Sequence, residues 1–267
     1  MSLQHAISRL SPKLTVFEPG HVWLAGAGPG NPGALTLDVV SALSQADAIV
    51  YDALVDSSIL SAAESAELHF MGKRGGRISA AQDDITALLI ALAGRKKRVL
   101  RLKGGDPYVF GRGGEEALAL ARNGIPFRIL PGVTSAFGAM ASVGIPATMR
   151  GLNKAIILAT GHAAGSDEDL DWAALAHTGQ PIVVYMGLKN LETIAAALLA
   201  GGLRPSTPVA VIASATTADE RILISDLANV TAEADAGGFA SPALIIVGSI
   251  VSMRAELLQF AREMQSA

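Results

Sequence analysis

Short hydrophobic runs alternate with longer amphipathic stretches along the first half of the chain. The hydrophobic runs, each short enough to be a buried strand, lie at 22–27, 47–51, 68–72, 98–102 and 127–130. The amphipathic stretches, which have the spacing of helices, lie at 34–46, 80–94 and 113–123. A series of strands and helices in alternation predicts a parallel β-sheet with helices on both of its faces.

The second half of the chain has a different pattern of hydrophobic runs. Its hydrophobic runs lie at 155–161, 181–187, 208–213, 221–227 and 242–248. The run at 221–227 follows the preceding one too closely for a long helix to fit between them, which predicts an antiparallel hairpin. We therefore expect two α/β domains, at 21–132 and 133–267. Residues 1–20 contain Pro12 and Pro19 and are predicted to form an extended N-terminal arm.

The amino-acid composition excludes several classes of protein and several kinds of active site. The chain has 267 residues, half of them hydrophobic, which is enough for one large domain or two compact ones. It has no cysteine, which excludes disulfides, thiolate metal sites and a cysteine nucleophile, and agrees with a cytoplasmic location. The histidines have no ligand spacing, so we expect no metal. We expect no membrane span, because no hydrophobic run approaches about 20 residues.

Charge is unevenly distributed. The net charge of −3 argues against binding to nucleic acid, yet the segment 73–112 holds ten basic and only three acidic residues. Arg95–Arg98 is interpreted as the solvated end of a helix. The other six basic residues flank glycine-rich loops and predict a basic cleft for an anionic ligand; they are Lys73, Arg74, Arg77, Arg101, Lys103 and Arg112.

The most informative stretch is VLRLKGGDPYVFGRGGEE at 99–116. A hydrophobic strand runs directly into Gly104 and Gly105, which lack a Cβ and so let another group approach the backbone closely. Asp106 follows, either as a partner for a cationic ligand group or as an organiser of its own loop. Open α/β sheets bind ligands at the carboxyl ends of their strands, so this loop is the first candidate for a binding site.

A second glycine-rich loop, GAGPGNPG at 26–33, follows the first predicted strand. Such a loop, with Asp52 near the end of the second strand, is also typical of dinucleotide-binding proteins, so a nucleotide-dependent oxidoreductase is one alternative. Pro29 and Pro32 argue against it, because proline removes the free amides that a pyrophosphate needs at a helix N-terminus. The loop is better suited to another ligand.

The motifs together resemble those of the S-adenosylmethionine-dependent tetrapyrrole methyltransferases over residues 21–262. The motifs, in order along the chain, are GAGPGNPG, IVYDALV, GKRGG, LKGGDPYVFGRGGEE, PGVTSA, GIPATMRG, ATGH, YMGL and SPALIIVG. The resemblance implies two α/β domains with S-adenosylmethionine in the cleft between them, and a homodimer. Within the family, LKGGDPYVFGRGGEE and GKR are most similar to members that methylate uroporphyrinogen III twice, giving precorrin-2 through precorrin-1 for cobalamin or sirohaem synthesis.

The resemblance also implies roles for individual residues. Asp52 and Lys73 match positions with proton-acceptor and proton-donor roles. The cofactor-binding positions are Pro29, Gly104, Gly105, Asp106, Val109, Thr134, Ser135, Met186, Ala215, Pro242 and Ala243. Because the substrate carries eight carboxylates, we also expect a set of basic residues to bind its acidic arms: Arg74, Arg77, Lys103, Arg112 and Arg150.

Two positions depart from the family pattern. Met149 stands where family members usually carry a histidine before Arg150, and the segment VIASAT at 211–216 lacks an acidic residue that many members have there. The first departure concerns contact with the substrate and the second the floor of the cofactor site. They leave two alternatives open, a methyltransferase for a later precorrin and a tetrapyrrole binder without catalytic activity. For Asp52 itself, the alternative is a structural role in capping a turn.

Overall fold

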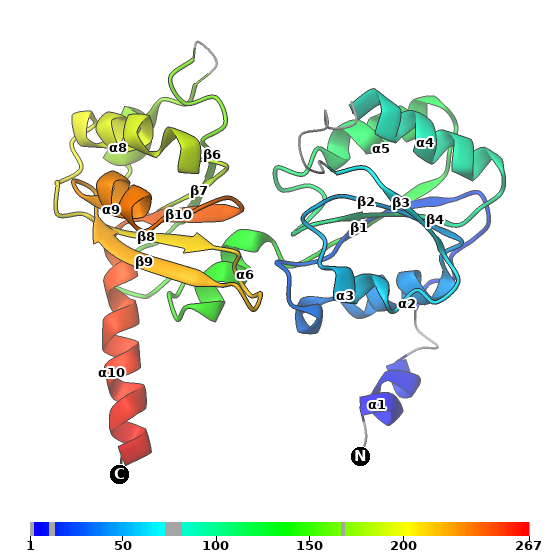
Figure 1. Cartoon of the computed structure of the whole chain (residues 1–267), viewed down its shortest axis with the longest axis horizontal. Helices are drawn as coiled ribbons and strands as arrows, with labels where there is room; N and C mark the ends of the chain where they lie inside the picture. Colours follow the sequence, from blue (N-terminus) through cyan, green and yellow to red (C-terminus); the bar gives the residue numbers. More distant parts are fainter. Residues whose placement is uncertain (1–2, 11–13, 73–81, 167–168, 267) are drawn as a thin grey trace. The chain divides into compact units, whose positions relative to one another are not determined.

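The chain folds into two compact units, Met1–Thr134 and Ser135–Ala267. The structure is a computed structural model (Figure 1), and it describes residues 3–10, 14–72, 82–166 and 169–266. Each unit is built around one five-stranded sheet. This two-sheet α/β architecture confirms the predicted fold class.

The first unit contains a parallel sheet with the strand order β3-β2-β4-β1-β5. Its strands are β1 (Val22–Gly26), β2 (Ala48–Tyr51), β3 (Glu67–Phe70), β4 (Val99–Lys103) and β5 (Phe127–Leu130). Its helices are α1 (Leu3–Leu10), the 3₁₀ turn η2 (Pro32–Ala34), α2 (Leu37–Gln45), α3 (Ser57–Leu60), α4 (Gln82–Gly94) and α5 (Gly113–Arg122). The parallel pairing predicted from the alternating pattern is confirmed.

Side-chain alternation gives this sheet two hydrophobic faces. In β1, Trp23 and Ala25 join the core under α2 and α3, whereas Val22 and Leu24 join the core under α4 and α5. Figure 1 shows these two pairs of helices on opposite sides of the sheet. The fully buried β1 therefore reads as a continuous hydrophobic run, as expected for a strand covered on both faces.

The N-terminal segment corrects one prediction. Residues 3–10 form the helix α1, whereas an extended arm was expected over 1–20. Leu3, Ile7 and Leu10 recur at the spacing of one helix face, and both prolines of this segment come after the helix ends. Proline breaks a helix only from within it, so Pro12 and Pro19 do not oppose this one.

The second unit contains a mixed sheet with the strand order β6-β7-β10-β8-β9. Its strands are β6 (Ile157–Thr160), β7 (Ile182–Tyr185), β8 (Pro208–Ala213), β9 (Arg221–Asp226) and β10 (Ala243–Val247). Its helices are α6 (Ser135–Ser142), α7 (Trp172–His177), η3 (Leu188–Asn190), α8 (Leu191–Ala200), α9 (Val230–Ala236), η4 (Ser249–Ser252) and α10 (Met253–Ser266). β8 and β9 pair in antiparallel fashion, which confirms the predicted hairpin.

The core of the second unit lies between its sheet and the helices α7, α8 and α9. Trp172 from α7, Ile194 from α8 and Val230 from α9 are buried against Val184, Val211 and other strand residues. None of the helices within the described ranges has the length and hydrophobicity that a membrane span requires.

An ion pair joins β2 and β4 at their amino ends. The Arg98 guanidinium donates to both Asp47 carboxylate oxygens, with Nη2–Oδ1 at 2.6 Å and Nε–Oδ2 at 3.0 Å. The backbone amide of Arg98 also donates to Oδ2, at 2.8 Å. The side-chain hydrogen bonds from Arg98 hold the pKa of Asp47 below its ordinary value.

The Asp47–Arg98 ion pair is expected to account for part of the loss of stability of the fold at acid pH. A carboxyl group whose pKa is lowered by folding stabilises the protein above its unfolded pKa, and the contribution is lost as pH falls through the lowered value. We expect the unfolding free energy of the wild type to fall more steeply below about pH 4 than that of Asp47→Asn. Denaturant unfolding between neutral and acid pH measures the two slopes, and equal slopes would contradict the prediction.

Candidate functional site

Three loops meet at the carboxyl edge of the first sheet, where the strands β1, β4 and β5 end. The loop after β1 pairs with the loop after β4, because Gly28 N donates to Gly105 O at 3.1 Å and Gly105 N donates to Gly28 O at 2.7 Å. A Cβ on Gly26 would lie 2.5 Å from the Gly105 carbonyl oxygen and 2.6 Å from the Gly132 Cα. These glycines therefore serve first to let the three loops pack directly on one another.

Asp106 organises this junction. Its Oδ1 accepts from the Tyr108 amide at 2.8 Å, and its Oδ2 accepts from the Gly132 amide at 3.0 Å. Of the two interpretations left open by the sequence, the structure supports the loop organiser, because both carboxylate oxygens already bind backbone amides. The same loop contains Phe110 and Arg112 in the left-handed conformation, with φ of 52° and 58°. Such backbone conformations are costly for non-glycine residues and gather at functional sites.

Asp52 lies just beyond the end of β2, about one quarter exposed. Its Oδ1 accepts from the Leu54 amide at 3.1 Å, and its Oδ2 lies 3.3 Å from Arg101 Nη2. Asp52 therefore caps the turn after the strand, as the structural alternative expected. It also forms an ion pair that the sequence reading had not assigned.

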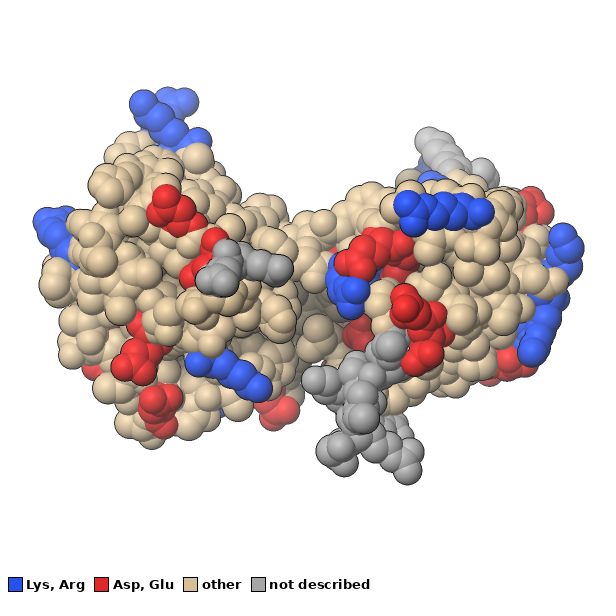
Figure 2. Space-filling view, turned by 90° about the horizontal axis from the view of Figure 1, so that it is seen from above, with Lys and Arg blue, Asp and Glu red and all other residues tan. Residues whose placement is uncertain are grey.

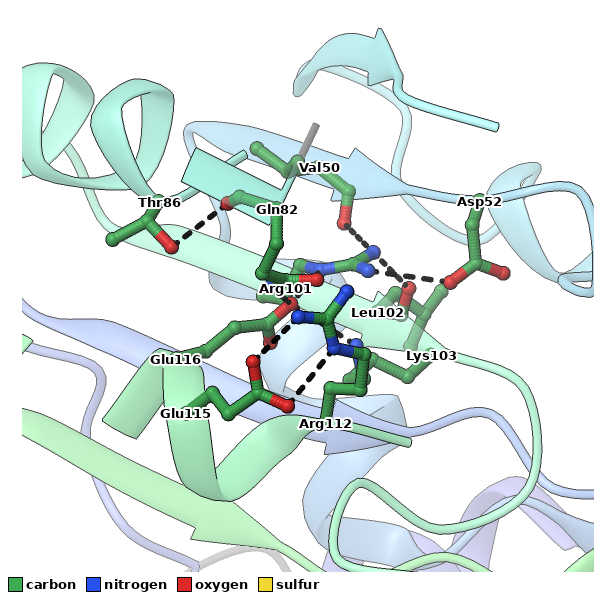
Figure 3. A network of polar contacts seen from close by, with 10 residues as sticks. All are labelled: Val50, Asp52, Gln82, Thr86, Arg101, Leu102, Lys103, Arg112, Glu115 and Glu116. Atoms are coloured by element: carbon green, nitrogen blue, oxygen red, sulfur yellow. Dashed lines mark hydrogen bonds and ion pairs between the residues drawn. The ribbon is translucent and has the colours of Figure 1, made fainter. Parts of the chain in front are cut away.

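Arg101, Lys103 and Glu116 form a buried charged cluster next to Asp52 (Figure 3). Glu116 is fully buried, and its Oε1 accepts from Gln82 Nε2 at 3.0 Å, from Arg101 Nε at 3.2 Å and from Lys103 Nζ at 3.1 Å. Alternation along β4 places Arg101 and Lys103 on the face covered by α5, whose first turn carries Glu116. Two cations and two carboxylates, counting Asp52, thus balance each other within the described residues.

The basic-cleft prediction is wrong for two of its six residues. Arg101 and Lys103 are 2% and 5% exposed, and their charges face Glu116 and Asp52 instead of an open groove. Lys103 is the last residue of β4, and burial together with the neighbouring Arg101 lowers its pKa. In Figure 2, the visible surface shows basic and acidic side chains scattered among uncharged ones.

The remaining basic candidates differ in how much the structure says of them. Lys73, Arg74 and Arg77 lie outside the described residues. Arg112 is exposed at the start of α5, where Nη2 binds Glu115 Oε2 at 2.6 Å. Arg150 is exposed in the loop after α6. As contacts to an acidic substrate, all of these remain predictions.

In the second unit, four predicted cofactor residues gather at one edge of the sheet. β10 runs antiparallel to both neighbours, so its first residue, Ala243, lies at the edge where β7 and β8 end. Met186 directly follows β7, and the Ser214 amide, next to Ala215, donates to the Pro242 carbonyl oxygen at 2.9 Å. Sheet pairing thus brings together residues that are up to 57 positions apart in the chain.

Backbone conformation marks this edge as unusual. Met186, Ser214 and Thr216 have φ of 54°, 49° and 65°, and the Met186 side chain is 51% exposed. Among the described residues, six non-glycine residues have positive φ, and five of them lie in this edge or in the loop after β4. The left-handed backbone conformation of Met186 is energetically unfavourable, and its exposed side chain gains little from packing. This combination favours a functional role for Met186 over a role in the hydrophobic core.

Glu220 was missed by sequence reasoning. It lies beyond the segment VIASAT that lacks the expected acid, yet its Oε2 accepts from the Thr216 amide and from Ser142 Oγ, each at 2.6 Å. A carboxylate therefore does organise this loop, from a position four residues further along the chain. The sequence carried no spacing signal for it, because the contact depends on how the loop between β8 and β9 turns back.

The remaining candidates are located in the chain as follows. Pro29 is partly buried beside the Gly28–Gly105 pair, and Val109 is partly buried in the loop after β4. Thr134 is buried at the end of the first unit, and Ser135 begins α6 in the second. Met149 is 39% exposed, and its amide donates to Asn153 Oδ1 at 2.8 Å. The described residues contain no group of three or more potential ligands of the His, Cys, Asp or Glu type.

Comparison with known proteins identifies the family. The model of the tetrapyrrole (corrin/porphyrin) methylases matches residues 21–231. A uroporphyrinogen-III C-methyltransferase of Sinorhizobium sp. is 47% identical over 247 residues, which are 91% of this chain and 88% of that protein. A siroheme synthase of Yersinia enterocolitica is 44% identical over 92% of this chain, but the chain spans only 52% of its length.

Solved structures agree with the sequence comparison. The uroporphyrin-III C-methyltransferase of Thermus thermophilus, in complex with S-adenosylhomocysteine, superposes with a TM-score of 0.74 and 38% identity, covering 87% of this chain and 99% of that one. A cobalt precorrin-4 methyltransferase superposes with a TM-score of 0.78 at 25% identity, covering 87% and 96%. The order of motifs, the two sheets and these matches agree, and the chain belongs to the tetrapyrrole methylase family.

Proposed function

We propose that this protein transfers methyl groups from S-adenosylmethionine to carbon atoms of uroporphyrinogen III, giving precorrin-2 through precorrin-1. The observation that carries the proposal is the 47% identity to a uroporphyrinogen-III C-methyltransferase over nearly the full length of both proteins. The chain spans about half the length of the curated siroheme synthases that it matches, so the proposal is limited to the methylation step. The product serves sirohaem synthesis, cobalamin synthesis or both.

Each unit, taken by itself, carries groups of the kinds that S-adenosylmethionine needs. That molecule carries an amino acid head, a ribose and an adenine, which need backbone donors and acceptors together with apolar contact. In the first unit these come from Pro29, the loop Gly104–Asp106, Val109 and Thr134. In the second unit they come from Ser135, from the exposed Met186, and from Ala215, Pro242 and Ala243.

When bound, S-adenosylmethionine would supply a methyl group on a sulfonium sulfur, and that sulfur would keep the electron pair of the broken carbon–sulfur bond. The protein must align the acceptor carbon with this methyl group, a positioning task that can supply about 7–11 kcal/mol. The acceptor carbon already carries an acidic arm and has no hydrogen, so a proton must then leave another position of the macrocycle or move within it. We assign its acceptance to Asp52, whose carboxylate is held at the carboxyl edge of the first sheet and remains partly exposed. Lys73 is the proposed proton donor.

The acidic arms of the substrate require cations that are still accessible. Arg112 and Arg150 meet this condition, because both are exposed and lie in loops. Arg112 now binds Glu115, and a substrate carboxylate could replace that surface partner at little cost. Lys103 is buried and its Nζ donates to Glu116, so it is the weakest of the candidates.

The proposal is tested by an anaerobic turnover assay. The purified protein is incubated with uroporphyrinogen III and methyl-labelled S-adenosylmethionine, and the label and the mass of the tetrapyrrole are measured. Two methyl groups per tetrapyrrole are expected. A single methyl group would indicate that the loop carrying Met149 limits the second transfer, whereas no label, with S-adenosylhomocysteine still binding in calorimetry, would exclude this substrate.

One second candidate is a methyltransferase for a later precorrin. It is favoured by the TM-score of 0.78 to the cobalt precorrin-4 methyltransferase and by Met149 in place of histidine. The same assay with later precorrins as acceptors separates the two. We also propose that the protein acts as a homodimer in the cytoplasm, which size-exclusion chromatography with light scattering and cell fractionation would test.

A further inference from the structure

Arg101 is the only cation in contact with Asp52 within the described residues, and its orientation is fixed on every nitrogen of its guanidinium (Figure 3). Nε donates to Glu116, Nη1 donates to the Val50 and Leu102 carbonyl oxygens at 3.3 and 3.1 Å, and Nη2 faces Asp52. A planar fork held at three points cannot rotate without breaking a buried hydrogen bond.

Glu116 determines where that fork sits. Its side chain is fully buried on α5, and its Oε1 accepts three hydrogen bonds, so it is fixed by Gln82 and Lys103 as well as by Arg101. Glu116 on α5 therefore fixes the position of Arg101, and Arg101 in turn contacts Oδ2 of Asp52, the carboxylate oxygen that is not bound within the turn. The other oxygen, Oδ1, is held by the Leu54 amide.

We propose that Arg101 and Glu116 are positioning residues for the reaction: they fix the Asp52 carboxylate in the orientation in which it accepts the substrate proton. This inference rests on the proposed function, in which Asp52 is the proton acceptor. A second ion pair between the same two strands provides a comparison, because Arg98–Asp47 joins β2 and β4 at their amino ends, away from the site. A purely structural role would make the two pairs equivalent.

The test is a double-mutant cycle between Arg101→Lys and Asp52→Asn, with kcat, the KM for uroporphyrinogen III and the dissociation constant of S-adenosylhomocysteine as measurements. Lysine keeps the charge but cannot form the fork. Because a misplacement of about 1 Å can cost about 10²-fold in rate, we expect Arg101→Lys to lower kcat by about 10–10²-fold with KM little changed. In the Asp52→Asn background, the same substitution should change kcat by less than about twofold.

Two further variants keep the test decisive. Glu116→Gln preserves the shape of the side chain and removes its charge; it should lower kcat in the wild-type background and leave it unchanged in the Asp52→Asn background. Asp47→Asn breaks the comparison pair and should leave kcat unchanged. Thermal unfolding and S-adenosylhomocysteine binding show that each variant is folded when it is assayed.

Each possible result either supports or overturns the positioning role of Arg101 and Glu116. Equal losses from Arg101→Lys with and without Asp52 would show that Arg101 acts independently of it, and would overturn the inference while the proposed function stands. The same holds if Asp47→Asn lowers kcat as much as Arg101→Lys does. If the wild-type protein transfers no methyl group to uroporphyrinogen III, the proposed function fails and this inference fails with it.

Discussion

Asp52→Asn is expected to slow methyl transfer by about 10²–10⁴-fold, the usual contribution of a general acid or base. Asparagine is similar in shape, and its side-chain oxygen can still accept from the Leu54 amide, so the turn after β2 should persist. It cannot accept the ring proton. We therefore expect kcat to fall while the affinity for S-adenosylhomocysteine stays within about twofold, because the loss affects the transition state alone.

A neighbouring carboxylate supplies the control. Asp56 caps α3 through the Ser58 amide at 2.8 Å and is the same kind of residue, four positions further along the chain. Asp56→Asn retains an excellent cap and should leave kcat unchanged. Single-turnover kinetics with labelled methyl donor measures both variants. Wild-type rates for Asp52→Asn would remove Asp52 from the mechanism, and equal losses in both variants would point to general damage.

Gly132→Ala is expected to have the largest effect on stability, through the junction of the three loops. A Cβ at this position would collide with the Gly105 carbonyl oxygen and with the backbone of Gly26, and neither can move as a side-chain end could. Overpacking typically costs about 1–3 kcal/mol, and rigid backbone on two sides places this site at or above the upper end. The shift of the loops should also weaken S-adenosylhomocysteine binding by at least about tenfold, equivalent to about 1.4 kcal/mol.

Gly114→Ala is the matched control for this variant. Gly114 lies in the first turn of α5, and a Cβ there would meet nothing within 4 Å. Alanine in an open helical position should be neutral or stabilise the protein by up to about 1 kcal/mol. Denaturant unfolding and calorimetry compare the two variants. Wild-type stability in Gly132→Ala would show that the junction of the loops can adjust.

The fold could be predicted from the sequence largely because burial on both faces leaves an unmistakable pattern. Strands such as VWLAG at 22–26 are hydrophobic throughout, and the parallel sheet, the second sheet and the hairpin at 208–226 all followed from runs of this kind. The N-terminal helix was missed because Pro12 and Pro19 were given more weight than the spacing of Leu3, Ile7 and Leu10. Element ends shifted by a few residues, since the pattern says little about where backbone pairing stops.

The site was predictable as a set of loops but not as a set of partners. Glycine and charge located the loop after β4, and Asp52 was found through family resemblance. Arg101 was counted as part of a basic surface, although its place in an alternating strand could have assigned it to the face under α5. The identity of its partner, Glu116, depends on how a helix lies over the sheet, which no local pattern encodes. The same limit hid Glu220.

The strand order of the first unit has a consequence for how the chain folds. β1 is made before any other strand, yet both of its neighbours, β4 and β5, come from residues 99–130. During synthesis, five hydrophobic or small residues of β1 therefore have no partner strand until most of the unit has left the ribosome. Pairing between such distant segments is slow, and exposed strand edges promote aggregation in the meantime. The strand order that holds Asp52 and Arg101, 49 positions apart, in one ion pair also leaves β1 unpaired in the nascent chain. Until β4 and β5 have been synthesised, the nascent chain therefore depends on protection against aggregation.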